Sequence, residues 1–139
     1  MRFVDSNVLI YALLKPKKDP NSNIAKIKRE SIEILKRIQQ GEVVATTVVH
    51  LSEVANIIAS RKSIKMSAEF VKEFMSLRNV KVYEVKAEDY LKASLIALEK
   101  SVDVNDALAY LKMRENGIKE IYTFDKHFNK LDVVIIREN

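Results

Sequence analysis

The sequence predicts an α/β fold in which helices cover a parallel sheet. Short apolar segments with strand character alternate with longer segments whose apolar residues recur at helical spacing. The predicted order is β-α-α-β-α-α-β-α-α-β-β, and strands that alternate with helices usually pair in parallel. The chain has 139 residues, 47% of them hydrophobic and 31% charged. We therefore expect one globular domain over residues 1–139.

The sequence pattern of the first half of the chain predicts two strands and three helices. Ser6 and Asn7 follow the first strand and can cap a helix, which Pro16 prevents from extending beyond Leu14. Isoleucines at helical spacing predict the second helix, Gly41 ends it, and a threonine at 46 or 47 caps the third. In order, these elements are expected at Arg2–Val4, Val8–Leu14, Ile24–Gln40, Glu42–Thr46 and residues 47–60.

The second half predicts three helices and three strands. Arg61–Lys65 is expected to be a basic connector, and alternating apolar and polar residues predict the strand after the next helix. Asp103 or Asn105 can cap the last helix, and Gly117 is a left-handed stop. The elements are expected at Ser67–Leu77, Val80–Val85, Glu88–Lys100, 103–116, Glu120–Thr123 and Asp132–Ile136.

Composition narrows the function. The net charge of +5 favours a polyanionic partner, chiefly nucleic acid, although many basic proteins bind none. The absence of cysteine excludes disulfides, thiolate metal sites and cysteine nucleophiles. No apolar run reaches the roughly 18 residues of a membrane helix, and no signal peptide is recognised, so a cytoplasmic location is expected. The 17 lysines, 12 glutamates and 14 isoleucines lean towards a thermophile.

Four acidic residues stand where such folds bind ligands. Asp5 and Asp125 each follow a strand, Asp106 lies in the first turn of a helix, and Glu53 shares a helix face with apolar residues. The carboxyl ends of parallel strands meet at one edge of the sheet. Carboxylates that converge there repel one another, and a divalent cation removes that penalty. An all-oxygen set of ligands suits Mg²⁺ or Mn²⁺.

Each acid also has a plainer explanation. Asp5 and Asp106 can be helix caps, because a carboxylate satisfies free amides and the helix dipole. Glu53 can be a boundary residue with its carboxylate in water, and Asp125 can simply form a turn. Spacing alone therefore supports an acidic α/β domain that can bind metal, and leaves these alternatives open.

The four acidic residues and the sequence around each, taken in chain order, resemble the four motifs of the PIN-domain ribonucleases. VDSNVLIYALL is similar to their opening Asp-Thr/Ser-Asn motif, and TTVVHLSEVANII to the second, with Glu53 as its glutamate. NDALAYLKMRENG matches the third through Asp106. IYTFDKHF matches the fourth, Thr-x-Asp-x-x-Phe, through Thr123, Asp125 and Phe128. The four motifs occur in family order across nearly the whole chain.

The resemblance implies a PIN-like three-layer α/β/α fold with about five short strands, and a metal-dependent endoribonuclease. It implies Asp5 and Asp106 as main ligands of Mg²⁺ or Mn²⁺, completed by Asp125 and Glu53. Cleavage would leave a 5′-phosphate and a 3′-hydroxyl. At this size the chain is most similar to VapC-type toxins, which implies an RNA substrate, a homodimer and a small antitoxin partner. A stand-alone PIN nuclease of RNA processing and a non-catalytic RNA-binding PIN domain stay open.

The remaining candidates have supporting roles. Asn7 can hold Asp5 or cap its own helix, Thr123 can bind a metal-bound water or a phosphate, and Asp103 can extend the acidic cluster, although a cap is preferred. His50 and His127 have no histidine partner at ligand spacing and are expected to be peripheral. The basic segment Lys15–Arg29 has no counterpart in the four motifs, and either faces substrate or is solvated surface.

Three other functional classes fit less well. A haloacid-dehalogenase-type phosphatase needs a second aspartate where this chain has Asn7. A phosphate-receiver domain needs paired acids before a strand-borne aspartate, and the order here differs. A non-catalytic RNA-binding module would tolerate loss of acids that are all present, and no aromatic stacking platform is evident.

Overall fold

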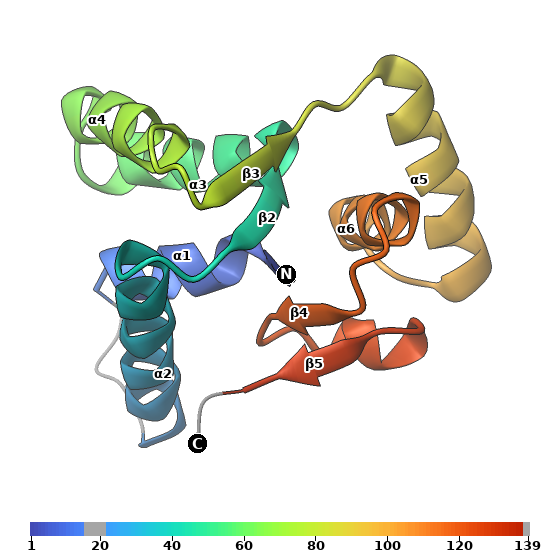
Figure 1. Ribbon diagram of the computed structural model, residues 1–139, viewed down its shortest axis with the longest axis horizontal. Helices are drawn as coiled ribbons and strands as arrows, with labels where there is room; N and C mark the ends of the chain where they lie inside the picture. The colour runs from blue at the N-terminus through green and yellow to red at the C-terminus, as the bar shows by residue number, and fades with distance from the viewer. Residues whose placement is uncertain (16–21, 138–139) are drawn as a thin grey trace.

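The computed structural model describes residues 1–15 and 22–137. The strands of this part of the chain form one five-stranded sheet, ordered β3-β2-β1-β4-β5, with every pair parallel (Figure 1). The strands are β1 (Arg2–Val4), β2 (Val44–Thr47), β3 (Val80–Tyr83), β4 (Glu120–Tyr122) and β5 (Val134–Ile136). The predicted parallel sheet is confirmed. Residues 16–21, part of the basic segment Lys15–Arg29, lie outside the described residues.

Helices cover both faces of the sheet, as predicted. They are α1 (Ser6–Leu13), α2 (Ser22–Gln39), α3 (Val48–Arg61), α4 (Ile64–Met75), α5 (Ala87–Lys100), α6 (Val104–Glu115) and the 3₁₀ helix η1 (Lys126–Lys130). The chain runs outward from β1 to β3 and then returns to β4 on the other side of β1. Because crossovers are right-handed, the return places its helices on the opposite face. Figure 1 shows α5 and α6 set apart from α1–α4, which gives the three layers.

Alternation along the strands supplies a core on each face. Val4 and Tyr122 pack with the helices α1–α4, and both are fully buried. Their strand neighbours Phe3 and Ile121, equally buried, pack with Met113 of α6 on the other face. Successive side chains of a strand point to opposite faces, so one short strand contributes to both cores.

Several predicted caps are confirmed. Thr47 caps α3 by accepting a hydrogen bond from the His50 amide (3.1 Å), and Asp103 caps α6 by accepting one from the Asn105 amide (2.8 Å). Gly117 follows α6 with a φ of +67°, in the left-handed region that glycine adopts readily.

Several predicted boundaries are wrong; β2, expected at Glu42–Thr46, spans Val44–Thr47. The helix predicted from Ser67 begins at Ile64, because the Ser63 hydroxyl accepts from the Met66 amide (3.0 Å) and caps it. The predicted connector Arg61–Lys65 therefore contains the cap and the first two residues of this helix. η1 replaces the expected loop after Asp125, β3 ends at Tyr83, and β5 begins at Val134.

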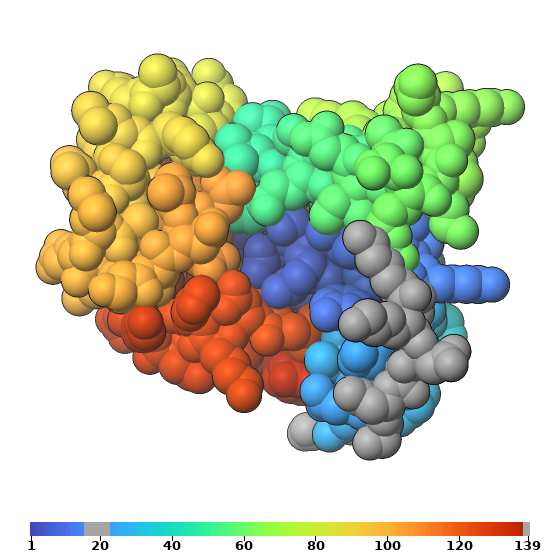
Figure 2. Space-filling model, turned by 180° about the vertical axis from the view of Figure 1, so that it is seen from behind, coloured from blue at the N-terminus to red at the C-terminus, as the bar shows by residue number. Residues whose placement is uncertain are grey.

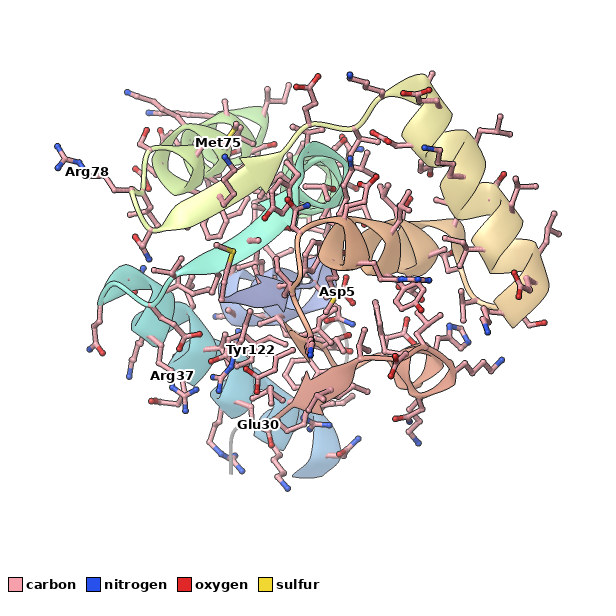
Figure 3. The ribbon with its side chains drawn as sticks, turned by 45° about the vertical axis from the view of Figure 1, so that its right-hand side comes forward. Asp5, Glu30, Arg37, Met75, Arg78 and Tyr122 are labelled. Carbon is pink, nitrogen blue, oxygen red and sulfur yellow. The ribbon has the colours of Figure 1, made fainter. Side chains whose placement is uncertain are left out.

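A hydrogen-bond network around the Tyr122 hydroxyl joins the sheet to α2. The hydroxyl accepts from Arg2 Nη1 (2.6 Å) and Arg37 Nη1 (3.0 Å) and donates to Glu42 Oε2 (2.8 Å). Figure 3 shows Arg37 beside Tyr122. The network connects β1, α2, β4 and Glu42, which lies two residues before β2. Within residues 1–15 and 22–137, no helix combines the length and apolar character needed to cross a membrane.

Candidate active site

The candidate site lies at the carboxyl edge of the sheet, where β1 and β4 end. The two strands are neighbours, with Val4 opposite Tyr122. β1 leads into α1 on one face, whereas β4 is reached from α6 on the other. A reversal of this kind leaves a crevice beyond the strand ends. Asp5 follows β1 and Asp125 lies just beyond β4, so both border that crevice.

Asp5 is the N-cap of α1 and also faces the crevice. Its Oδ1 accepts a hydrogen bond from the Ser6 amide (2.9 Å), and its Oδ2 accepts one from the Thr123 hydroxyl (2.8 Å). The Asp5 side chain is thereby held by Ser6, which follows β1, and by Thr123, which follows β4. The helix-cap explanation is correct for Asp5, yet each carboxylate oxygen keeps a further lone pair that can bind a cation.

Glu53 reaches the crevice from α3. Its Oε1 accepts a hydrogen bond from the Ser6 hydroxyl (3.1 Å). Ser6 therefore holds two acids at once, Asp5 through its amide and Glu53 through its hydroxyl. Glu53 is half-buried and lines the cleft, so it is more than a solvated boundary residue.

Asp106 enters from the first turn of α6. Asp103 is the cap of that helix, as preferred from the sequence, and Asp106 follows inside the first turn. Asp106 is buried, and its Oδ2 has no hydrogen-bond partner among the described residues. A buried acceptor without a partner costs about 1–3 kcal/mol. A role in capping α6 therefore does not explain why Asp106 Oδ2 is buried.

Asp125 begins η1 and brings His127 to the site. Asp125 Oδ1 accepts from the His127 amide (2.8 Å), which folds the chain back towards α6. The His127 ring then lies with Nδ1 3.4 Å from Asp125 Oδ1 and 3.5 Å from Asp106 Oδ2. The prediction that His127 is peripheral is wrong. One sequence feature could have predicted this position: His127 lies two residues after Asp125, an aspartate that can form a turn.

His50 is also not peripheral. It is 1% exposed, with Nδ1 2.7 Å from Thr47 Oγ1 and Nε2 3.1 Å from the backbone oxygen of Asn105. Burial lowers the pKa of His50 to about 4. The neutral ring joins α3, which carries Glu53, to the start of α6, which carries Asp106. Sequence spacing gives no sign of this contact, because its partners lie on separate elements.

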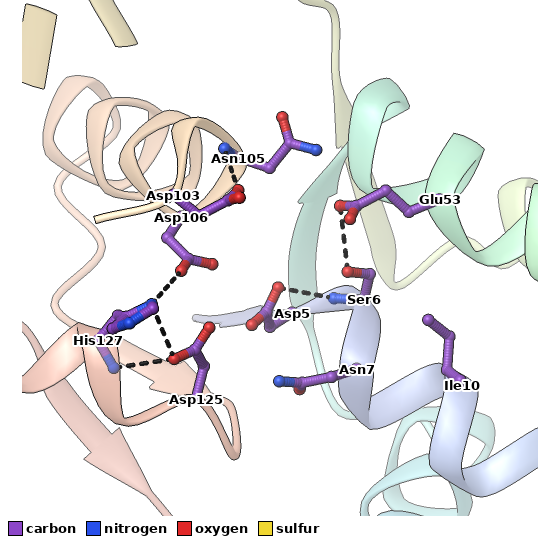
Figure 4. Close-up of a pocket in the computed structure, with 10 residues that line it drawn as sticks. All are labelled: Asp5, Ser6, Asn7, Ile10, Glu53, Asp103, Asn105, Asp106, Asp125 and His127. Atoms are coloured by element: carbon purple, nitrogen blue, oxygen red, sulfur yellow. Dashed lines mark hydrogen bonds and ion pairs between the residues drawn. The ribbon is translucent and has the colours of Figure 1, made fainter. Parts of the chain in front are cut away.

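One cleft of about 320 Å³ collects all four predicted acids. Figure 4 shows Asp5, Glu53, Asp106 and Asp125 pointing into it from four segments of the chain. In Figure 2 the hollow lies near the middle of the molecule, with blue N-terminal residues at its floor. The lining also includes Ser6, Asn7, Ile10, Asp103, Asn105 and His127.

Burial, and to a smaller extent mutual repulsion, disfavours the ionisation of these acids. Burial raises the pKa of Asp5 to about 6, the Asp125 charge adds to the rise, and hydrogen bonds from Thr123 and Ser6 oppose it. Burial also raises the pKa of Asp106 to about 8, helped by its contact with the Asp125 carboxyl and by the Asp5 charge. The pKa of Glu53 is raised by burial as well, against the opposing effect of His50.

The cleft fits a divalent cation. Asp106, Asp125 and His127 each offer one ligand atom, and these atoms all lie within 4.8 Å of one another. The unpartnered Asp106 Oδ2 is one of the available carboxylate oxygens. Carboxylates suit Mg²⁺ and Mn²⁺, and a cation would offset the repulsion that raises the acid pKa values.

The supporting candidates hold the site together. Thr123 donates its hydroxyl to Asp5 and accepts from the Asp125 amide (3.0 Å), so it links the two acids. Asn7 Oδ1 accepts from the Phe124 amide (3.5 Å) and joins α1 to the segment after β4. Asp103 lines the cleft in addition to capping α6.

Comparison with known proteins identifies the fold. A family model described as PIN domain matches residues 2–134. The Mycobacterium tuberculosis toxin VapC20, described as cleaving the sarcin-ricin loop, is similar over 99% of this chain and 100% of its own, with 20% identity and a TM-score of 0.72. VapBC2 of Rickettsia felis, bound to a promoter DNA fragment, is similar over 99% and 98%, with 14% identity and a TM-score of 0.64.

A toxin–antitoxin complex from Klebsiella pneumoniae is similar over 98% of this chain and 97% of its own, with 14% identity and a TM-score of 0.66. At such identities the structural likeness establishes a shared fold. Among curated proteins, none has a sequence that matches this chain.

Proposed function

The chain belongs to the PIN-domain family, and we propose that it is a metal-dependent endoribonuclease that acts in the cytoplasm as the toxin of a type II toxin–antitoxin pair. One observation carries the proposal. Four acids from four separate segments converge on one cleft, and Asp106 keeps a buried oxygen that has no hydrogen-bond partner within residues 1–15 and 22–137. This arrangement costs stability in the absence of a cation, so a role in binding one explains it.

The proposed ligands are Asp5 and Asp106, with Asp125 and Glu53 completing the site directly or through water. A bound Mg²⁺ or Mn²⁺ would supply an activated water and offset charge on the phosphoryl oxygens during in-line attack. Thr123 and Ser6 keep the Asp5 and Glu53 carboxylates directed at the cleft. Hydrolysis would break the bond between phosphorus and the 3′ oxygen, leaving a 5′-phosphate and a 3′-hydroxyl.

A second hollow next to the cleft supports RNA as the substrate. It has a volume of about 290 Å³, shares Asp125 with the cleft, and is lined by Lys126 and Arg137. Arg137 Nε donates to Glu30 Oε2 (2.8 Å), whereas Lys126 is exposed, so its ammonium group can attract an RNA phosphate.

The toxin role is proposed from the relatives. VapC20 is described as a toxin, and VapBC2 and the Klebsiella protein belong to toxin–antitoxin systems. We propose that a small antitoxin covers the acidic cleft and inserts a cationic side chain that excludes metal or RNA. Co-expression with the product of a neighbouring short open reading frame should give a stable complex without nuclease activity. If no such reading frame exists, a nuclease of RNA processing becomes the better account.

We also propose that the protein is a homodimer that pairs through α5. Leu91, Leu95 and Leu98 form an exposed apolar stripe on this helix, at 63%, 59% and 80% exposure. Lys92 and Glu99 flank the stripe on one side. In an antiparallel pair centred near Leu95, Lys92 lies opposite Glu99 of the partner subunit, so the surface is complementary to itself.

The function is tested by incubating the purified protein with a mixed panel of labelled RNAs in Mg²⁺, in Mn²⁺ and in EDTA. The double variant Asp5→Asn, Asp106→Asn is compared with Asp132→Asn, which changes an exposed aspartate outside the cleft. Cutting that needs metal, survives in Asp132→Asn and vanishes in the double variant supports the nuclease and its site. Equal cutting by all proteins would instead identify a contaminant and contradict the proposal.

A further inference from the structure

His127 adds a nitrogen to a group of oxygens in the cleft. Its Nδ1 lies 3.4 Å from Asp125 Oδ1 and 3.5 Å from Asp106 Oδ2. The three ligand atoms of Asp106, Asp125 and His127 lie within 4.8 Å of one another, close enough for one ion to contact all three after small side-chain rotations. The four acidic motif positions alone offer only oxygen.

A second observation indicates that this group binds a cation. Asp106 is 7% exposed, and its Oδ2 has no hydrogen-bond partner among the described residues. This oxygen faces His127 Nδ1. Asp5 differs, because Ser6 and Thr123 already donate to its two oxygens. The less satisfied ligand atoms therefore lie on the side of the cleft formed by α6 and η1.

The position of His127 is fixed by its neighbours. Its amide donates to Asp125 Oδ1 (2.8 Å), and the next residue, Phe128, is fully buried in the core. The backbone that carries the imidazole is therefore anchored on both sides. The ring itself is half exposed, at 51%, which leaves it accessible to an ion entering from solvent.

We propose that His127 is a ligand of the metal ion and that the site consequently prefers Mn²⁺ to Mg²⁺. The proposal rests on the metal dependence in the proposed function. Mg²⁺ favours oxygen ligands and retains its bound waters. Mn²⁺ is a transition-metal ion, the first of the series Mn²⁺, Fe²⁺, Co²⁺ in which affinity for nitrogen ligands rises, and it accepts imidazole more readily than Mg²⁺ does. With one nitrogen added to the carboxylates, Mn²⁺ is expected to bind about tenfold more tightly than Mg²⁺.

The preference is measured with metal-stripped protein by titrating Mn²⁺ and following the electron paramagnetic resonance signal of the free ion, with and without competing Mg²⁺. His127→Ala is compared with Asn129→Ala, which alters an exposed residue of the same short helix. Wild type and Asn129→Ala should share the preference. In His127→Ala, Mn²⁺ affinity should fall roughly tenfold or more while Mg²⁺ affinity changes far less. Circular dichroism checks that both variants are folded.

Ligation is read directly from bound Mn²⁺ by pulsed electron paramagnetic resonance. A ¹⁴N coupling typical of imidazole should appear in wild type and Asn129→Ala and disappear in His127→Ala. His50 is a poor alternative source, because both of its ring nitrogens already contact Thr47 or Asn105.

The outcomes separate the inference from the proposed function. If Mn²⁺ binds and RNA is cut, but the ¹⁴N coupling is missing or the metal preference is unchanged in His127→Ala, then His127 is only an ion-pair partner of the acids and this inference is overturned. If neither metal binds the wild type, the metal-dependent function fails together with it.

Discussion

Asp106 combines burial, negative neighbours and an oxygen that accepts no hydrogen bond from the described part of the chain. In the folded protein its pKa rises to about 8, with burial as the largest cause, whereas in the unfolded chain it ionises near pH 4. Between these values the folded protein binds a proton that the unfolded chain does not. Stability attributable to Asp106 is therefore lost as pH rises towards 8.

This gives a prediction for the metal-free protein between pH 6.5 and 8.5. In EDTA, wild type should lose on the order of 1 kcal/mol across this range after allowance for solvent screening, roughly 3–6 °C in melting temperature. Asp106→Asn should remove this pH dependence, because its amide does not titrate. The window lies above the folded-state pKa of Asp5, about 6, and of His50, about 4.

The measurement is thermal unfolding by circular dichroism at several pH values. Asp132→Asn, an exposed aspartate outside the cleft, should keep the wild-type slope. Parallel slopes in wild type and Asp106→Asn would contradict the assignment of the effect to Asp106. Addition of Mn²⁺ should stabilise wild type most at the alkaline end and should leave Asp106→Asn nearly unchanged.

Thr123 is a positioning residue for two acids. Thr123→Val keeps the shape of the buried side chain but removes the hydroxyl that donates to Asp5 and accepts from the Asp125 amide. We expect metal affinity and RNA cleavage to fall about 10–100-fold, as for other residues that orient metal ligands. Thr123→Ser should restore both to within about threefold. Wild-type activity in the valine variant would contradict this role of the hydroxyl, and loss of activity in the serine variant as well would indicate that the methyl group also contributes.

At the scale of elements, the sequence predicts most helices and strands but misplaces their ends. Periodicity identifies a helix after α3, yet the basic residues around Ser63 hide the cap that starts it. η1 was missed because its five residues are too few for a periodic pattern and depend on the Asp125 turn.

The residues of the candidate site also divide into those that the sequence predicts and those that it does not. The acids could be predicted because they occur in recognisable motifs. His127 and His50 could not, because their contacts with Asp106 and with Asn105 form only after α6 and its neighbours pack together.

The start of α4 gives a test of an element boundary. Ser63→Ala removes the hydroxyl that accepts from the Met66 amide and should cost about 1 kcal/mol of unfolding free energy. Ser60→Ala, at an exposed position in the last turn of α3, should cause no such loss. Urea unfolding measures both. An unchanged midpoint for Ser63→Ala would favour the later start at Ser67. RNA cleavage should be unaffected in both variants, since neither serine lines the cleft.

At the scale of the whole molecule, charge and apolar surface are distributed unevenly. The chain carries a net charge of +5, yet its cleft gathers carboxylates, so the basic residues that would attract RNA lie outside the ligand group. The right-handed return from β3 to β4 leaves α5 as the outermost helix of its layer, packed mainly on α6. Its outward face is consequently available to another subunit.

The proposed dimer predicts that a charge in the middle of the α5 stripe dissociates it. Leu95→Glu would bring two carboxylates together near the two-fold axis, and should weaken dimerisation by about 2 kcal/mol or more. Ile64→Glu, at a residue of α4 that is 81% exposed, should remain dimeric. Light scattering after size exclusion gives the mass of each protein.

A charge exchange tests the orientation of the two helices. Lys92→Glu should weaken the dimer by roughly 0.5–1 kcal/mol for each of the two symmetric pairs, because the new carboxylate faces Glu99 of the partner subunit. Adding Glu99→Lys should restore it, since the pairs are re-formed with their signs reversed. In a parallel arrangement Lys92 would not face Glu99 of the partner subunit, so exchanging the two charges would restore nothing. If the wild-type protein is monomeric at a concentration of tens of micromolar, α5 is not a homodimer interface. The apolar stripe of α5 would then be expected to bind a different protein.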